Sequence, residues 1–322
     1  MEGCVMAASK VSGRKLKLAV PDLISNSYFP AAAAVELGFF ASEGLDVSLE
    51  LIFPVSKCYE ALRDGAIDFV GGAAHAVLAA FPEWRGAKLI ATQAQGMYWF
   101  LVMRADLGAR RGDLDVVKGK RIGAAPWVEM GLRQLLIDAG YDLARDAIDI
   151  VGIPLNPAIG PNFGLGAAKA LEEGRIDGFW ANGMGAEISV TSGVGTVVLD
   201  IRRGDGPANS FGYTFASIAT TDRLIAEEGE TAAASVRAIV ATQKALKADV
   251  ALATEAGRKL FPPREANLIA DIVARDLPYY DASIAPQTVI RLNEFCRARE
   301  LLHGDPAFEA VVERTLAPLW VA

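Results

Sequence analysis

The chain has 322 residues, which is enough for two domains that each bury a core of their own. Hydrophobic residues make up 52% of it and charged residues 22%, so we expect a folded chain with little disorder. The net charge of -7 argues against a nucleic-acid surface, because binding to phosphate backbones needs a clustered excess of Lys and Arg.

The first hundred residues alternate between strand and helix patterns. In chain order we expect a strand, a helix, a strand, a helix and two strands, at residues 15–20, 30–42, 45–53, 57–63, 67–70 and 88–92. Gly71 and Gly72 predict a turn, with a further helix from Ala73. Such alternation predicts a parallel sheet with helices on both faces.

A short repeat links two distant parts of the chain. Residues 61–68 and 170–177 both read A-L-x-x-G-x-I-D, which predicts a helix that ends at a glycine and leads into a buried strand. The second of these strands is followed by a glycine turn at Gly183. We therefore expect two lobes that share one local plan.

After about residue 196 the pattern changes to two strands, at 196–201 and 213–219, and then to a helical tail. The expected helices of the tail lie at residues 231–247, 250–260, 264–275, 286–300 and 306–315. Because the tail needs a surface to pack on, we expect the chain to return to the first lobe, with crossings near 96–104 and 209–216. The predicted organisation is a flexible start at 1–14, lobe 1 at 15–100 with 210–322, and lobe 2 at 101–209.

Four motifs in this order are similar to those of the type II solute-binding proteins of ABC importers, in the sulfonate, nitrate, taurine and thiamine-pyrimidine-precursor group. In chain order they are the segment 34–47 (AVELGFFASEGLDV), the first copy of A-L-x-x-G-x-I-D at 61–68, the segment 117–123 (VKGKRIG) and the second copy at 170–177. The resemblance covers nearly the whole chain from Lys15. It implies an α/β fold of two lobes, a type II periplasmic-binding-protein-like fold with a central cleft and two crossover strands.

The resemblance also implies a function, which is to capture a small organic ligand by hinge closure for an ABC importer. The implied ligand is anionic by preference, of sulfonate, carboxylate or pyrimidine type, and the implied partner is an ABC permease. No cofactor is implied, and we expect a monomer. The family is periplasmic, but no apolar segment precedes Gly3-Cys4, so no export signal is visible and a cytoplasmic location stays open. Because the same fold hosts enzymes, a cofactor-independent lyase that uses Cys58 or His75 is the alternative.

Ligands of open α/β sheets bind beyond the carboxyl ends of the strands, so we place the candidate site in the loops there, at 22–29, 71–75, 126–130, 160–166 and 180–183. The candidate ligand-binding residues in these loops are Ser25, Asn26, Tyr28, Phe29, Gly72, Ala73, His75, Trp127, Phe163, Trp180 and Asn182. Structural alternatives stay open: a helix cap with a packed ring in the first loop, a tight turn at the glycines, a structural histidine and core tryptophans. The sequence shows no catalytic set and no metal-ligand spacing.

Overall fold

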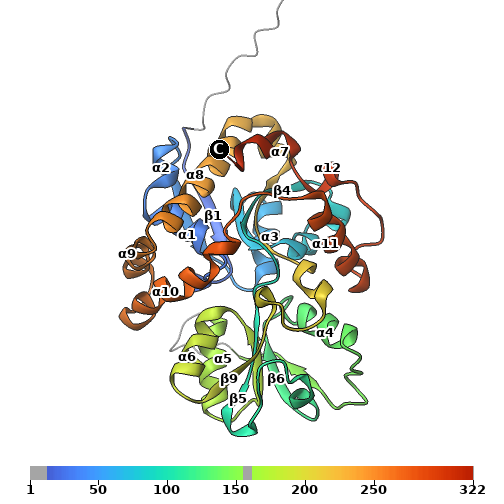
Figure 1. The fold of residues 1–322 in the computed structure, drawn as a ribbon. Helices are drawn as coiled ribbons and strands as arrows, with labels where there is room; N and C mark the ends of the chain where they lie inside the picture. Colours follow the sequence, from blue (N-terminus) through green and yellow to red (C-terminus); the bar gives the residue numbers. More distant parts are fainter. Residues whose placement is uncertain (1–12, 155–161, 322) are drawn as a thin grey trace, which may run out of the picture.

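The computed structural model describes residues 13–154 and 162–321. The chain forms two lobes, drawn one above the other in Figure 1, with two segments that pass between them. Lobe 1 contains the first sheet and the helical tail, and lobe 2 contains the second sheet. Of the predicted flexible start, residues 1–12 lie outside the described residues.

Each lobe is built on a five-stranded mixed sheet. The sheet of lobe 1 has the order β2 (Val47–Leu51), β1 (Leu16–Val20), β3 (Phe69–Ala73), β10 (Ala216–Thr221) and β4 (Ala87–Ala94). The sheet of lobe 2 has the order β7 (Asp149–Val151), β6 (Arg121–Ala124), β8 (Gly178–Ala181), β5 (Phe100–Arg104) and β9 (Gly195–Asp200).

The two sheets share one topology. In each, the first three strands are parallel and the fourth runs antiparallel to both of its neighbours. The fourth strands, β10 and β5, are also the first strands after the two crossings between the lobes. The predicted fold of two α/β lobes with one local plan is therefore confirmed.

Helices pack against both sheets. In lobe 1 they are α1 (Phe29–Glu36), α2 (Phe39–Ser42), α3 (Val55–Arg63), α7 (Asp222–Glu227), α8 (Gly229–Ala248), α9 (Ala251–Leu260), α10 (Pro263–Asp276), α11 (Pro286–Ala298) and α12 (Phe308–Val311). In lobe 2 they are α4 (Glu129–Asp138), α5 (Phe163–Glu172) and α6 (Gly183–Thr191). The tail returns to lobe 1, where α8 packs against α1, α2 and β4 (Figure 1). Among the helices of the described ranges, none combines the length and the apolar character needed to cross a membrane.

Gly71 and Gly72 lie inside β3, so the turn predicted there is wrong. β3 is the middle strand of its sheet, and both glycines are crowded: a Cβ on Gly71 would come 3.0 Å from Gln93 Nε2, and one on Gly72 would come 3.0 Å from Tyr59 OH. Glycine here permits close packing against a buried strand and does not mark a change of direction. Gly183, also predicted as a turn, is the first residue of α6.

Two predicted helices are interrupted. The helix expected at 30–42 divides into α1 and α2 at Gly38, which has a φ of 80° that favours glycine. The helix expected at 306–315 shortens to α12, because Val312 leaves the helix to form a parallel bridge with Leu89 of the edge strand β4.

Candidate functional site

A cavity of about 40 Å³ lies between the lobes, at the carboxyl ends of strands from both sheets. Its lining consists of Pro21, Asp22, Ser25, Tyr28, Phe53, Val55, Tyr98, Trp99, Ala125, Pro126, Val128, Phe163, Ala181 and Asn182. Sites for small molecules usually enclose about 300–1,000 Å³, so this cavity is small for such a site. The loops that follow β1 and β2 form one wall, and the loops that follow β6 and β8 form the other.

Asp22 is the carboxylate of this cavity and joins the two lobes. It follows β1 of lobe 1 and is only 8% exposed. Its Oδ1 accepts hydrogen bonds from the backbone N–H of Ile24 at 2.9 Å and from Asn162 Nδ2 at 3.1 Å, and its Oδ2 accepts one from Asn182 Nδ2. Both oxygens of the carboxylate are therefore satisfied, two of the three bonds coming from lobe 2.

The two asparagines that bind Asp22 are the N-caps of α5 and α6. The Oδ1 of Asn162 accepts from the N–H of Leu165 at 3.1 Å, and the Oδ1 of Asn182 accepts from the N–H of Gly185 at 3.4 Å. Because each amide oxygen is held by its own helix, each amide NH₂ is directed at Asp22. The positive ends of the two helix dipoles also favour a negative charge at this position.

Burial raises the pKa of Asp22 from 3.8 to about 6, and the hydrogen bonds from Ile24 and Asn182 oppose this shift. The carboxyl group is therefore largely ionised at neutral pH and places a negative charge at the cavity wall.

Aromatic rings make up much of the remaining wall. Tyr28 of lobe 1 and Tyr98 of the first crossing meet edge to face at 5.5 Å between ring centroids, and their hydroxyl groups share a hydrogen bond. Burial raises the pKa of both tyrosines, so both keep their protons at neutral pH. Ser25 Oγ lies in this lining, is buried, and has no hydrogen-bond partner among the described residues. An unpartnered buried hydroxyl beside a cavity is suited to contact a ligand.

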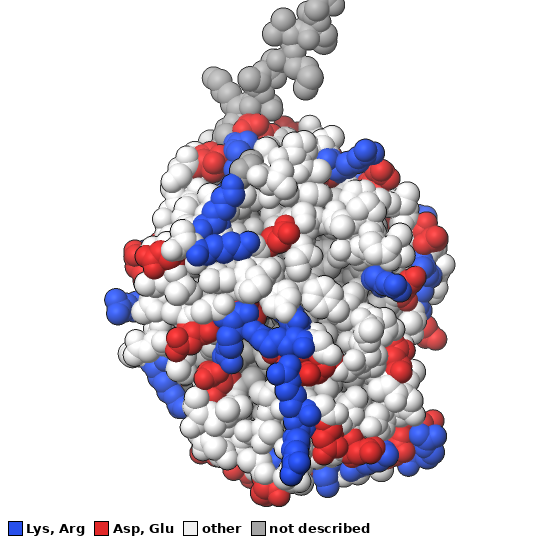
Figure 2. Space-filling model, in the orientation of Figure 1, with Lys and Arg blue, Asp and Glu red and all other residues white. Residues whose placement is uncertain are grey.

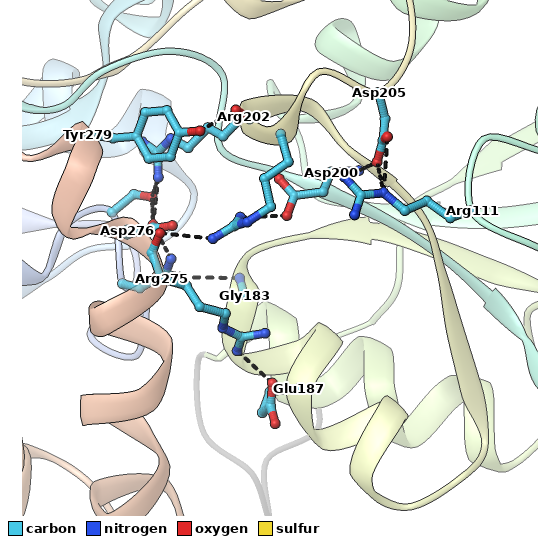
Figure 3. A network of polar contacts seen from close by, with 12 residues as sticks. Arg111, Gly183, Glu187, Asp200, Arg202, Asp205, Arg275, Asp276 and Tyr279 are labelled. Atoms are coloured by element: carbon cyan, nitrogen blue, oxygen red, sulfur yellow. Dashed lines mark hydrogen bonds and ion pairs between the residues drawn. The ribbon is translucent and has the colours of Figure 1, made fainter.

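A second buried aspartate, Asp276, lies behind the cavity at the end of α10. It forms an ion pair with Arg202 Nη1 at 2.6 Å, and the side chains of the pair are 3% and 2% exposed. Arg202 follows β9 in the second crossing and also donates to the carbonyl oxygen of Gln95 in the first crossing, at 2.8 Å. Its guanidinium lies over the rings of Tyr98 and Tyr279, and Figure 3 shows Arg202 beside Tyr279. Arg202 therefore ties the two crossings to each other and to lobe 1.

Asn26 connects this pair to lobe 2. Its amide donates to Asp276, and its Oδ1 accepts from the N–H of Gly183 at 3.2 Å. A Cβ on Gly183 would lie 2.8 Å from that Oδ1, so only glycine permits this approach of α6 to lobe 1.

Exposed ion pairs line the rim of the junction (Figure 3). Arg275 of α10 pairs with Glu187 of α6 at 2.5 Å, and so joins lobe 1 to lobe 2. Figure 2 shows Lys and Arg side chains gathered at the level where the lobes meet, beside acidic ones. Such pairs fix orientation and contribute little stability each, because water screens them.

His75 is a structural contact between the lobes. Its ring is buried against Trp99, Trp127 and Phe295, with Nδ1 3.0 Å from Thr214 Oγ1 and Nε2 3.0 Å from the carbonyl oxygen of Trp127. The carbonyl only accepts, so Nε2 carries the proton in the neutral ring and Nδ1 accepts from Thr214. Burial lowers the pKa of His75 to about 4, which keeps the ring neutral.

Cys58, the other residue of the lyase alternative, lies in α3 with its thiol directed at the carbonyl oxygen of Ile52, 3.0 Å away. Burial raises the pKa of this thiol to about 12, so it is not a nucleophile at neutral pH. Neither Cys58 nor His75 is among the described residues that line the cavity.

Four predicted residues, Ser25, Tyr28, Phe163 and Asn182, lie together in the cavity lining. Asn26 acts between the lobes behind it. The other predicted residues lie outside the lining: Phe29, Gly72, Ala73, His75, Trp127 and Trp180. Of the predicted loop at 160–166, Gly160 and Pro161 lie outside the described residues.

Trp180 and Phe29 are core residues. Trp180 is fully buried in β8, 6.1 Å from Trp99 between ring centroids, and Phe29 packs on Phe261. Asp22 lies in the predicted loop 22–29 but was not among the candidate residues, although it follows a strand. Tyr98 and Trp99 lie outside the predicted loops and were missed as lining residues.

A larger hollow of about 410 Å³ opens on the hinge side, between the two crossings and α11. Its lining includes Gln95, Phe211 and Arg291. Among the described residues, none of its side chains is a buried polar group without a partner.

The two lobes, their shared sheet order and the cavity at the strand ends define a type II periplasmic-binding-protein fold. No family model and no curated protein matches the chain. Solved structures do match it. A protein from Bordetella bronchiseptica RB50 has a TM-score of 0.71 at 22% identity, over 96% of this chain and 95% of that chain.

Two further structures of the same fold were solved with a small molecule. The alkanesulfonate-binding protein SsuA from Xanthomonas axonopodis pv. citri, bound to MOPS, has a TM-score of 0.69 at 15% identity, over 96% of this chain and 99% of that chain. A DSZB mutant in complex with biphenyl-2-sulfinic acid has a TM-score of 0.60 at 14% identity, over 95% and 98%. These likenesses show the fold that the sequence motifs predict.

Proposed function

We propose that the chain is a solute-binding protein that captures a small organic ligand between its lobes and delivers it to an ABC importer. The observation that carries the proposal is the cavity at the carboxyl ends of strands from both lobes, which closes through the bonds of Asn162 and Asn182 to Asp22. The sulfonate-binding role of SsuA, which has the same fold, supports it.

Closure in this proposal is a rotation of two bodies about the two crossings. The bodies are residues 15–100 with 210–322, and residues 101–209. Arg202 contacts both crossings and so defines the axis. Binding then replaces water between the walls with ligand, and the closed form is the form that a permease recognises. The protein acts as a monomer in the periplasm.

A thermal-shift screen of sulfonates, carboxylates and aminopyrimidines tests the proposal. Every hit is then examined for closure by small-angle scattering and for turnover by NMR. We expect ligands that raise the melting temperature and lower the radius of gyration without forming a product. Formation of a product would instead establish an enzyme.

Two phenylalanine variants locate the binding site. Phe163→Ala removes a ring from the cleft cavity, and Phe211→Ala removes one from the hinge-side hollow. We expect Phe163→Ala to weaken binding at least about tenfold and Phe211→Ala to leave it unchanged. The opposite pattern would move the site to the hollow and refute capture in the cleft.

A further inference from the structure

The charges of the cleft bear on the class of its ligand, and this inference rests on the proposed function. We propose that the cleft takes a small molecule that presents a cationic or N–H-donating nitrogen group to Asp22, and that it discriminates against sulfonates and carboxylates. The proposal selects among the three ligand types expected from the sequence.

The first observation is the net charge of the lining. Among the described residues of the lining, Asp22 is the only Asp or Glu, and none is a Lys, Arg or His. The buried cation Arg202 lies over the ring of Tyr98 and is already paired with Asp276 at 2.6 Å. The cavity therefore presents one uncompensated negative charge to whatever enters it.

The second observation is that the place in lobe 2 that favours an anion, at the N-termini of α5 and α6, is already occupied by the carboxylate of Asp22. The N-termini of α5 and α6 with their cap amides favour an anion, and Asp22 of lobe 1 supplies one. Asp22 is held to lobe 1 by the N–H of Ile24, so it remains on the cleft wall when the lobes separate. An anionic ligand would have to displace this carboxylate or lie beside it away from water, where like charges repel strongly.

The third observation is the capacity left for a donor. A carboxylate accepts about four hydrogen bonds, and Asp22 receives three. Ser25 Oγ, buried and without a partner among the described residues, lies in the same lining and offers a further acceptor. The rings of Tyr28, Tyr98 and Trp99 belong to the same lining, and the faces of such rings attract cations.

A pair of planar probes of equal shape and opposite charge tests the inference on the full chain. The probes are benzamidinium and benzoate, with benzenesulfonate as a second anion, and binding is measured by calorimetry at neutral pH. We expect benzamidinium to bind at least about tenfold more tightly than either anion. This comparison needs only the wild-type protein, so it does not depend on a variant that folds.

Two matched variants assign the preference to its residue. Asp22→Asn removes the charge of the cleft, and we expect it to weaken benzamidinium binding about tenfold and to strengthen benzoate binding. Asp113→Asn changes the net charge equally on an exposed part of lobe 2, and we expect it to change neither affinity.

The outcomes separate the inference from the function beneath it. Tighter binding of benzoate or benzenesulfonate, or a preference for benzamidinium that Asp22→Asn leaves intact, overturns the inference while the solute-binding role stands. Binding of any probe that survives Phe163→Ala also overturns it, because the probe then lies outside the cleft. If no probe binds at millimolar concentration, the inference fails, and the solute-binding role is decided separately by the thermal-shift screen.

Discussion

Asp22 and Asp276 are both buried carboxylates at the junction of the lobes, yet their surroundings differ. Asp276 has a guanidinium at 2.6 Å, so its charge is neutralised inside the protein. Asp22 receives only backbone and amide N–H groups, which stabilise a charge without cancelling it. Since an uncompensated buried charge is costly, Asp276 belongs to the framework, and Asp22 is the group that a ligand would neutralise.

The largest effect should come from breaking the neutralised pair. Asp276→Ala leaves Arg202 buried without its counter-ion, so we expect the free energy of unfolding to fall by about 3–5 kcal/mol in urea titrations followed by circular dichroism. Glu294→Ala is the control, because it breaks the exposed pair with Arg291 and should cost less than about 1 kcal/mol. Equal losses in the two variants would show that Asp276 is not needed as a counter-ion.

His75 is a third buried titratable group at the junction of the lobes, and its ring is neutral in the folded protein. Its pKa is lowered from 6.5 to about 4, so the unfolded chain binds a proton more readily than the folded one between these values. The stability that the neutral ring provides is therefore present above pH 6.5 and is lost as pH falls toward 4. Between pH 7 and pH 5 this loss amounts to about 2 kcal/mol.

The variant His75→Gln removes this titration. We expect urea midpoints at pH 7 and pH 5 to differ less in the variant than in the wild type. The groups that face the ring are Thr214, the Trp127 carbonyl and three aromatic rings, none of them charged. A variant with the same pH dependence as the wild type would exclude His75 as its source.

Substitutions at two glycines of α5 test whether the hydrogen bond from the Asn182 amide to Asp22 contributes to ligand affinity. A Cβ on Gly164 would lie 2.8 Å from Asn182 Oδ1 and push that side chain away from Asp22, whereas a Cβ on Gly166 meets nothing within 4 Å. We expect Gly164→Ala to weaken benzamidinium binding about tenfold, or about 1.4 kcal/mol, and Gly166→Ala to leave it unchanged. Calorimetry measures both, and equal affinities would refute a role for this contact.

The smallest effect concerns the charge of Asp22 itself. Its pKa is raised from 3.8 to about 6, so the folded chain holds this proton more tightly than the unfolded one, and the wild type gains stability as pH falls through 6. The gain between pH 7 and pH 5 is about 1 kcal/mol, and Asp22→Asn should lack it. Tyr28 and Tyr98, which also face Asp22, stay protonated over this range because burial raises their pKa. Urea titrations at the two pH values measure the free energy of unfolding. An equal change in this free energy between pH 7 and pH 5 in wild type and variant would contradict the prediction.

Sequence patterns predicted the fold and four of the residues that line the cavity. Ser25, Tyr28, Phe163 and Asn182 were found because they lie directly beyond strands, and parallel strands end at one edge of a sheet. Tyr98 and Trp99 were missed because they lie in a crossing, where no periodic pattern indicates which way a side chain points. Gly71 and Gly72 were misread because glycine serves turns and close packing alike.

The order of strands and helices, the repeated local plan and the return of the tail were determined by the sequence itself, since they depend on hydrophobic periodicity and on residues that end helices. Tertiary structure alone decided the roles of the charged groups. Asp22 and Asp276 look alike in the sequence, but only one of them meets an arginine that follows a strand of the other lobe. The charge of a buried group depends on partners that are distant along the chain, and folding brings those partners together.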